Sequence, residues 1–360
     1  MVSSRRLLAA GVVGALAVAL TGCTAAAATS STGSASAAST KVEPLVLYAA
    51  EGYDAAMAKA FTAKTGIPVK VDDDSTGPLL TKIAAEKNNP QWSLLWVDGD
   101  QAFASLDQQG ELLHYKSPVT LTAEGKAIQP SDNAYSPTGT TVMAALIYNA
   151  AKTSAVPTSY QDLLGSAYAG KVGMNDPAQS GPTYPFIAGV MNQLGGQSSN
   201  GINKGESYFQ SLKSNGLKVF PTNGDTLHAL ETGQIDYGLI QSSAAVGETI
   251  KVKPTAQFQP KIVYLPKSTL LPSVLGIDKG VDATQQAEGK KFIDFALSPA
   301  GQKVMQGADT SGDSLFWPVV AGVSALPQLP TFPSSYQRLD PTYWGAKEPS
   351  VVSWFEQSIK

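Results

Sequence analysis

The sequence predicts an α/β protein with two lobes, each a mixed, mostly parallel sheet flanked by helices. Short apolar segments alternate with helical segments over most of the chain after residue 40, which is the rhythm of βαβ units. The chain of 360 residues exceeds the size of one ordinary domain. Its composition, 43% hydrophobic and 15% charged residues, is typical of a globular protein with a modestly charged surface.

The first forty residues are expected to lie outside this fold. Arg5 and Arg6 precede an apolar run, 7–20, which is shorter than the ~20 residues that span a bilayer. A charged start followed by a short apolar run predicts a secretory signal peptide. Residues 24–40 are Ala, Ser, Thr and Gly without a large apolar side chain, so they predict a flexible tether.

The signal run ends in Leu20-Thr21-Gly22-Cys23, which resembles the lipobox of bacterial lipoproteins. This resemblance implies that Cys23 becomes the lipidated mature N-terminus, carrying palmitate-type acyl chains that anchor the protein to the membrane. A simple Ala-x-Ala cleavage site and a short membrane anchor are the alternatives. Cys23 is the only cysteine, so an intrachain disulfide, a cysteine-based zinc site and a catalytic thiol in the globular part are excluded.

The strands and helices follow in alternation. The first lobe is expected to hold strands at 44–48, 67–71 and 94–97, and helices at 54–65 and 78–87. A crossing strand at 142–148 leads to the second lobe, where we expect strands at 171–174, 217–220 and 237–241, with helices at 160–164, 185–194, 206–215 and 226–232. Segments 262–265 and 272–277 lead back to the first lobe, and helices follow at 285–297 and 301–306.

These elements predict the domain organisation of the chain. We expect a signal peptide at 1–23, a tether at 24–40, lobe 1 at 41–141 plus 272–330, lobe 2 at 142–271, and a C-terminal strap over the surface at 331–360. No segment after the signal has ~18 uninterrupted apolar residues, so no further membrane span is predicted.

Six loops that follow the predicted strands are small, polar or glycine-containing. They are 49–52, 74–77, 98–100, 176–181, 223–225 and 241–243. Ligands of open α/β sheets bind at the carboxyl ends of strands, and the first turn of a helix offers unpaired N–H groups to anions. The alternative for each single loop is ordinary helix capping, which favours the same residue types.

The loops supply the candidate ligand-binding residues. The segment 175–184 is the most informative, because the Ser180 hydroxyl and the Gly181 and Thr183 amides are suited to hold one oxyanion. The complete candidate set is Ala50, Glu51, Ser75, Thr76, Gly77, Asp98, Ser180, Gly181, Thr183, Tyr184, Asn223, Gln241 and Ser242. Glu51, Asp98 or Asp100 is a candidate partner for a cationic end of the ligand, and no metal ligands or cofactor are predicted.

Several segments resemble type II solute-binding proteins of bacterial ABC importers. They are 48–52, 60–69, 76–80, 83–86, 110–112, 160–164, 168–172, 176–177 and 297–302. The resemblance spans about 45–305 and is closest to the group of ferric-iron, phosphonate and thiamine binders, family 1-like. It implies a type II periplasmic-binding-protein fold with a ligand held in the cleft between two lobes.

The resemblance also bears on the ligand. In the ferric binders, residues that match Ser180 to Thr183 and Asn223 hold an anion beside the iron, and a tyrosine pair that holds the metal follows the strand matching 237–241. This chain has Ser242, Ser243, Ala244 and Ala245 there. We therefore predict a phosphonate or phosphate-ester type ligand, with ferric iron or an iron complex held by non-tyrosine ligands as the alternative.

The sequence-based prediction is an extracytoplasmic, lipid-anchored, monomeric binding protein that closes on its ligand and delivers it to an ABC permease with its ATPase subunit. The net charge of −3 argues against nucleic acid. An enzyme acting on phosphoesters and a surface adhesion protein are the alternatives from other classes. No catalytic motif contains His114 or His228, so both are expected to be structural, and the chain is not predicted to be an enzyme.

Overall fold

The computed structural model describes residues 43–360, so the predicted signal peptide, Cys23 and tether lie outside the described residues. Within them, one mixed sheet has the strand order β2-β1-β3-β8-β4-β7-β5-β6, and β9 pairs with β8. The strands are β1 (Leu45–Ala49), β2 (Val69–Asp73), β3 (Leu94–Asp98), β4 (Ser136–Asn149), β5 (Val172–Asn175), β6 (Lys218–Phe220), β7 (Tyr237–Ile240), β8 (Pro260–Ile277) and β9 (Tyr336–Gln337).

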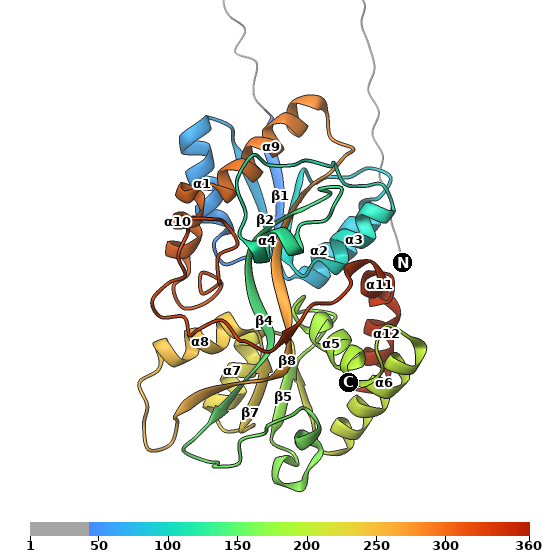
Figure 1. The fold of residues 1–360 in the computed structure, drawn as a ribbon, viewed down its shortest axis with the longest axis vertical. Coiled ribbons are helices and arrows are strands. Elements are labelled where there is room, and N and C mark those ends of the chain that lie inside the picture. Colours follow the sequence, from blue (N-terminus) through green and yellow to red (C-terminus); the bar gives the residue numbers. More distant parts are fainter. Residues whose placement is uncertain (1–42) are drawn as a thin grey trace, which may run out of the picture. The chain divides into compact units, whose positions relative to one another are not determined.

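The two long strands β4 and β8 run through both halves of the molecule (Figure 1). Residues 136–143 of β4 pair antiparallel with 269–275 of β8, and 145–149 pair with 260–264, with an irregular register between Met143 and Ala145. Both strands therefore link the half built on β1, β2 and β3 to the half built on β5, β6 and β7. The predicted strands 262–265 and 272–277 are parts of the single strand β8.

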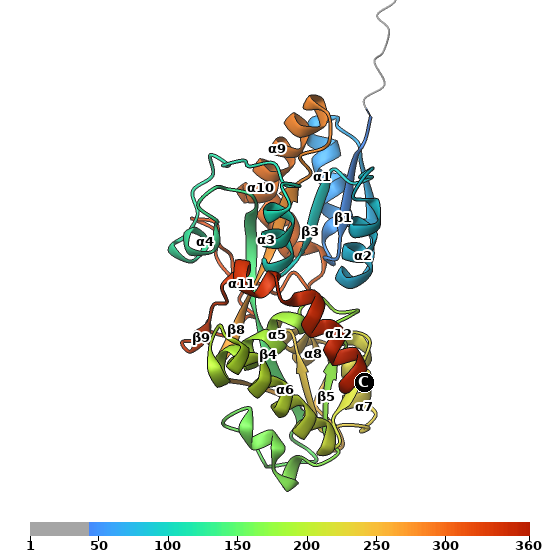
Figure 2. The ribbon, with the colours of Figure 1, turned by 90° about the vertical axis from the view of Figure 1, so that its right-hand side faces the viewer.

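Helices cover both faces of the sheet in the half built on β1, β2 and β3, which we call the upper half (Figure 2). They are α1 (Asp54–Thr65), α2 (Thr76–Glu86), α3 (Gln101–Gln108), α4 (Ala123–Ile128), α9 (Ala283–Leu297) and α10 (Pro299–Ala308). One face buries Phe61 and Phe292, and the other buries Leu79 and Phe103. Both faces of β3 are covered, which explains its continuous apolar sequence.

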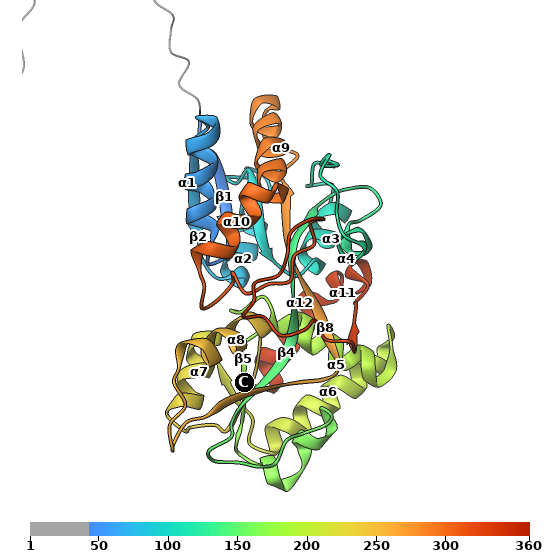
Figure 3. The same cartoon turned by 60° about the vertical axis from the view of Figure 1, so that its left-hand side comes forward.

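The lower half, which is built on β5, β6 and β7, also has helices on both faces of the sheet (Figure 3). Its helices are α5 (Thr183–Gly195), α6 (Ser199–Ser214), α7 (Asn223–Glu231) and α8 (Ser242–Lys251). Phe186 and Phe209 lie in the cluster on one face, and Leu230 and Ala245 lie in the cluster on the other. The predicted α-helix at 160–164 is instead a short 3₁₀ helix, Gln161–Leu164, because Gly165 adopts an extended conformation that ends it.

The C-terminal segment differs from the surface strap that we expected. It forms α11 (Pro341–Gly345) and α12 (Glu348–Ser358), and it contributes Trp344, Val351 and Phe355 to the buried cluster of α5 and α6. It also contacts the upper half, because α11 packs against α3. The segment thus has a buried side as well as an exposed one.

The predicted α/β fold with mixed sheets flanked by helices is confirmed, although the strands of both halves belong to one sheet. The pairs among β1, β2 and β3 and among β5, β6 and β7 are parallel, and those of β8 with β3, of β8 with β4 and of β4 with β7 are antiparallel. No helix among residues 43–360 is long and apolar enough to cross a membrane.

Candidate functional site

A cavity of about 170 Å³ lies where the two halves meet. It is lined by the loops that follow β1, β2, β3, β5, β6 and β7 and by the loop that follows α10. Its lining residues are Ala50, Ser75, Thr76, Asp98, Gln179, Ser180, Gly181, Pro182, Thr222, Asn223, Gly224, Gln241 and Asp313. The carboxyl ends of strands from both halves therefore face one space, as the sheet topology requires.

The two halves touch at the edge of this cavity. The Gly77 N–H of α2 donates to the Gln179 carbonyl of the lower half at 3.4 Å. A Cβ added at Gly77 would overlap the Ala178 carbonyl, and one added at Gly181 would overlap the Thr76 side chain. Gln241 Nε2 also donates to Asp98 Oδ2 across the cavity at 2.7 Å. These contacts define a closed arrangement of the halves.

The lower wall of the cavity is made of neutral hydrogen-bonding groups at two helix N-termini. Asn175, fully buried at the end of β5, donates to Ser180 Oγ at 3.2 Å and to Asn223 Oδ1 at 2.6 Å. Its own Oδ1 accepts a hydrogen bond from Thr226 at 2.7 Å. One buried amide thus holds together the loops that begin α5 and α7.

The start of α7 is capped without blocking its first amides. Thr222 accepts from the Asp225 N–H at 3.3 Å, and the Asp225 carboxylate accepts from the Thr222 N–H at 3.1 Å. This capping box leaves the Asn223 and Gly224 N–H groups beside the cavity. Because the helix dipole favours negative charge at an N-terminus, this wall is suited to an oxyanion.

The upper wall carries carboxylates. Asp98 at the end of β3 and Asp313 from the loop after α10 line the cavity, and Glu51 lies buried behind them. Glu51 accepts a hydrogen bond from Ser273 Oγ at 2.6 Å, and Asp313 accepts from the Gly52 N–H at 2.8 Å. Within 43–360, none of these three carboxylates forms an ion pair with a lysine, arginine or histidine.

Burial and mutual repulsion raise the pKa values of these acids. Burial raises the pKa of Glu51 well above its ordinary value, and the charges of Asp98 and Asp313 raise it further. The pKa of Asp98 is raised for the same two reasons, burial and the nearby Asp313 charge. Burial raises the pKa of Asp313 to about 6. A positive charge placed in the cavity would offset this cost and favour the ionised carboxylates.

Eight of the candidate residues predicted from the sequence line this one cavity. They are Ala50, Ser75, Thr76, Asp98, Ser180, Gly181, Asn223 and Gln241. Gly77 lies at the point where the halves touch, and Glu51 lies behind the upper wall.

Three predicted residues are turned away from the cavity. The Thr183 N–H donates to the Ser180 carbonyl at 3.1 Å, so it does not offer the expected oxyanion contact. The Tyr184 hydroxyl donates to the Trp344 carbonyl, inside the core. Ser242 Oγ accepts from the Val142 N–H at 3.1 Å. The Thr183 amide and the hydroxyls of Tyr184 and Ser242 thus already have hydrogen-bond partners within the fold.

Five lining residues were missed: Gln179, Pro182, Thr222, Gly224 and Asp313. The first four lie in or beside loops that the sequence had singled out. Asp313 belongs to a loop that follows a helix, so the rule that ligands bind at the carboxyl ends of strands does not predict it. The only available signal was the acidic, glycine-containing stretch 309–313, in which Asp309 accepts a hydrogen bond from the Asp313 N–H at 2.8 Å.

The lining residues combine neutral hydrogen-bonding groups with two carboxylates. Asp98 and Asp313 are the only anionic side chains among the lining residues. No tyrosine, histidine, lysine or arginine is among them. Ferric iron favours more anionic oxygens than this wall offers. Ser180 is hydrogen-bonded to an amide rather than to a base, so it lacks the activation that a nucleophile needs.

Comparison with known proteins identifies the class. The family model described as bacterial extracellular solute-binding protein matches residues 56–334, and the chain belongs to this family. Members of this family are solute-binding proteins that act outside the cytoplasm. The putative 2-aminoethylphosphonate-binding periplasmic protein of Salmonella typhimurium is 26% identical over 249 residues, which are 68% of each chain.

Solved structures with the same fold confirm the predicted type II periplasmic-binding-protein architecture. Iron-bound HitA from Pseudomonas aeruginosa aligns with a TM-score of 0.70 and 22% identity, over 86% of this chain and 98% of HitA. AfuA from Actinobacillus pleuropneumoniae, with fructose-6-phosphate bound, aligns with a TM-score of 0.73 and 20% identity, over 88% of this chain and 98% of AfuA. The fold is therefore shared by proteins with different ligands.

Proposed function

We propose that this chain is the ligand-binding component of an ABC importer for a small zwitterion that joins an amine to a phosphonate. The observation that carries this proposal is the division of the cavity into two chemically opposite walls. Amides and hydroxyls at the starts of α5 and α7 suit the phosphonate, and the carboxylates of Asp98 and Asp313, which form no ion pair within 43–360, suit the amine. The relative from Salmonella typhimurium supports the same class of ligand by its name.

The cavity size agrees with such a ligand. A volume of about 170 Å³ accommodates a molecule of few heavy atoms and is small for a drug-sized one. A simple phosphonate would fill the lower wall and leave the acids unpaired. An aminophosphonate would satisfy both walls at once, which makes closure dependent on both ends of the molecule.

The mechanism that we propose is closure of two lobes on the ligand. We assign residues 41–141 and 272–330 to one lobe and 142–271 to the other, with β4 and β8 as the connection. The contacts of Gly77, Gly181 and Asp98 form only when the lobes are together. A ligand that bridges both walls binds the closed state better than the open one and shifts the population toward it. A permease coupled to an ATPase subunit would then recognise the closed form.

The same proposal includes a monomeric binding protein that does not act as an enzyme and is held at the outer side of the membrane by a lipid on Cys23. The motif Leu20 to Cys23 supports the anchor, and labelling with a radioactive fatty acid tests it. Cys23→Ser should abolish the label and release the protein from the membrane. A labelled Cys23→Ser protein would contradict the anchor without bearing on the ligand.

Calorimetry tests the ligand. We expect 2-aminoethylphosphonate to bind with micromolar or better affinity, and ethylphosphonate, which lacks the amine, to bind at least ~30-fold more weakly, about 2 kcal/mol. Phosphate esters without an amine should resemble ethylphosphonate. Equal affinity for the two phosphonates would contradict the amine assignment, and no binding of either would contradict the ligand class.

A further inference from the structure

A second cavity, which shares no residue with the ligand cavity, lies beside α3. Its volume is about 360 Å³, and its wall includes α3, the turn before β4, part of β8 and the start of α11. Three carboxylates line it, those of Asp100, Asp107 and Asp132, and the one cation among its lining residues, Arg338, is already paired with Glu124. Asp100 is only 9% exposed, and its carboxylate forms no ion pair within 43–360. The lack of a counter-charge on this buried acid points to a positively charged guest.

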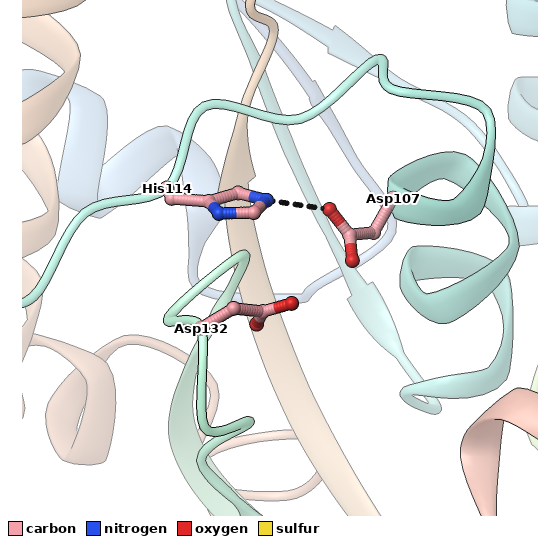
Figure 4. Close-up of side chains that lie close together, drawn as sticks. All are labelled: Asp107, His114 and Asp132. Carbon is pink, nitrogen blue, oxygen red and sulfur yellow. Dashed lines mark hydrogen bonds and ion pairs between the residues drawn. The ribbon is translucent and has the colours of Figure 1, made fainter.

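Asp107, His114 and Asp132 come together at the rim of this cavity (Figure 4). Asp107 is in the last turn of α3, His114 is in the segment that follows, and Asp132 is in the turn before β4. His114 Nε2 lies 2.7 Å from Asp107 Oδ1. One ligand atom from each of the three residues lies within 4.8 Å of the other two.

The backbone around these side chains is held in place. On one side of His114, the Leu113 N–H donates to the Ile277 carbonyl of β8 at 2.9 Å. On the other side, the Tyr115 N–H donates to the Asn133 carbonyl at 2.9 Å, which ties His114 to the turn that carries Asp132. Asp132 Oδ1 accepts the Ala134 N–H at 3.1 Å. The side chains of Asp107, His114 and Asp132 thus converge from segments whose backbones are held by hydrogen bonds.

We propose that Asp107, His114 and Asp132 bind a divalent transition-metal cation such as Zn²⁺, with its open coordination positions facing the second cavity. Zinc binds imidazole nitrogen and carboxylate oxygen at about 2.0–2.2 Å, so its ligand atoms lie roughly 3.3 Å apart, within the spread seen here. The metal replaces the proton between His114 and Asp107. Imidazole favours such metals over Ca²⁺ and Mg²⁺.

This proposal differs from our sequence-based expectation that His114 is structural and that the chain has no metal ligands. The three residues are separated along the chain and follow no metal-binding motif, so only the fold brings them together. The site is independent of the proposed ligand, because it shares no residue with the ligand cavity.

Zinc titration by calorimetry, with the full chain in a Cys23→Ser background to remove its thiol, tests the proposal. We expect one Zn²⁺ per chain with a Kd on the order of 10 µM, and a rise in melting temperature when zinc is added. His114→Ala and Asp132→Asn should each weaken zinc binding at least tenfold. The matched control is His228→Ala, since the only other histidine is also exposed and lies 4.0 Å from Glu231.

The proposal is overturned if the parent protein binds no zinc, or if His114→Ala binds it as tightly as the parent does. Loss of zinc in His228→Ala would overturn it as well, because that histidine is remote from the cluster. His114 and Asp132 are both exposed, so we expect the variants to fold, and circular dichroism checks this. If His114→Ala does not fold, the result with Asp132→Asn decides.

Discussion

The two walls of the ligand cavity differ in how completely they are satisfied within the protein. On the lower wall, Asn175 holds Ser180 and Asn223 by hydrogen bonds, and its own oxygen is paired with Thr226. On the upper wall, Asp98 and Asp313 repel each other, and no lysine or arginine within 43–360 pairs with them. The hydrogen-bonding groups of the lower wall are thus preorganised before a ligand binds. The carboxylates of the upper wall have no counter-charge until a cationic ligand binds.

This difference assigns separate roles to the walls. A preorganised set of donors gives affinity for the anion, because little ordering is left to occur on binding. Unpaired acids give selectivity, because a guest without a positive charge leaves their desolvation cost in place. The closure contacts are common to both walls. Substitutions at these three places should therefore have effects of different size and different ligand dependence.

The largest effect is expected from closure. In Gly77→Ala, the new Cβ would overlap the Ala178 carbonyl when the halves meet, so the closed state is lost while each half still folds. We expect at least a ~100-fold loss of affinity, about 2.7 kcal/mol, for any ligand. Calorimetry measures the loss, and small-angle scattering should show no ligand-induced compaction. Gly307→Ala is the control, because nothing lies within 4 Å of a Cβ at Gly307. Unchanged affinity in Gly77→Ala would refute the closure contact.

The next largest effect separates the upper wall from the lower one. Asp98→Asn keeps the size of the side chain and an oxygen for Gln241, and it removes the charge. We expect the affinity for 2-aminoethylphosphonate to fall by ~30-fold, about 2 kcal/mol, and that for ethylphosphonate to stay the same or rise. Titration of both ligands against the variant measures this. An equal loss for both would mean that Asp98 acts on closure rather than on the amine.

Substitutions in the lower wall should weaken binding of phosphonates with and without an amine to the same extent. Ser180→Leu or Asn223→Leu places a bulky apolar group where the phosphonate is expected, so both phosphonates should bind at least tenfold more weakly, about 1.4 kcal/mol. Asn203→Leu, at an exposed position of α6, is the matched control. If both variants bind as the parent does, the anion site is placed wrongly.

A smaller effect concerns stability and pH. Burial raises the pKa of Asp313 to about 6, and that of Asp100 and of Glu348 to about 7. These groups keep their protons in the folded protein at pH values where the unfolded chain has released them. The free energy of unfolding should therefore decrease as pH rises from about 4 to 7. We expect the melting temperature without ligand to be about 3–6 °C lower at pH 8 than at pH 5.

Ligand should reverse part of this trend. An ammonium group stabilises the ionised acids, so the affinity for 2-aminoethylphosphonate should rise over the same pH range. Scanning calorimetry at both pH values, with and without ligand, measures the two effects. A melting temperature that rises from pH 5 to pH 8 in the absence of ligand would contradict the raised pKa values.

The smallest effect is expected at the C-terminus. Lys360 forms an ion pair with Asp176, which begins the loop that leads to Ser180. Lys360 is about half exposed, but the Asp176 side chain is only 2% exposed and keeps the Ala178 N–H as a hydrogen-bond donor, so Lys360→Ala should cost about 1–2 kcal/mol of stability. We expect ligand affinity to change by less than threefold in calorimetry. A tenfold loss would show that the last residue positions the loop of the lower wall.

The strand-end loops could be predicted from the sequence because the carboxyl ends of parallel strands must share one edge. The same rule placed Asp98, Ser180 and Asn223 together, and all three line the cavity. It failed for Ser242, because the direction of a side chain at a helix start depends on its partner, here the Val142 N–H. It also failed for Asp313, whose position depends on how the chain returns after α10, and no local pattern encodes that return.

The core was predicted less well at the C-terminus than at the N-terminus. Val351, Phe355 and Ile359 recur at helical spacing, a signal that our prediction did not use. The surface that they cover is supplied by the cluster of α5 and α6, which no local pattern of this segment encodes. The long strand β8 was divided in our prediction because polar residues interrupt it near Lys267 and Ser268. Pairing with β4 and β9 overrides this local composition.

The placement of α12 also has a consequence for how the protein forms. Phe355 packs edge-on against Phe209 at a ring-centroid distance of 5.9 Å, and Trp344 is fully buried in the same cluster. A ribosome adds Trp344 and Phe355 long after it has added α5 and α6. The half that contains α5 and α6 therefore lacks part of its interior until residues 344–355 have been added. Until that segment docks, the apolar side chains that it covers on α5 and α6 remain exposed to water.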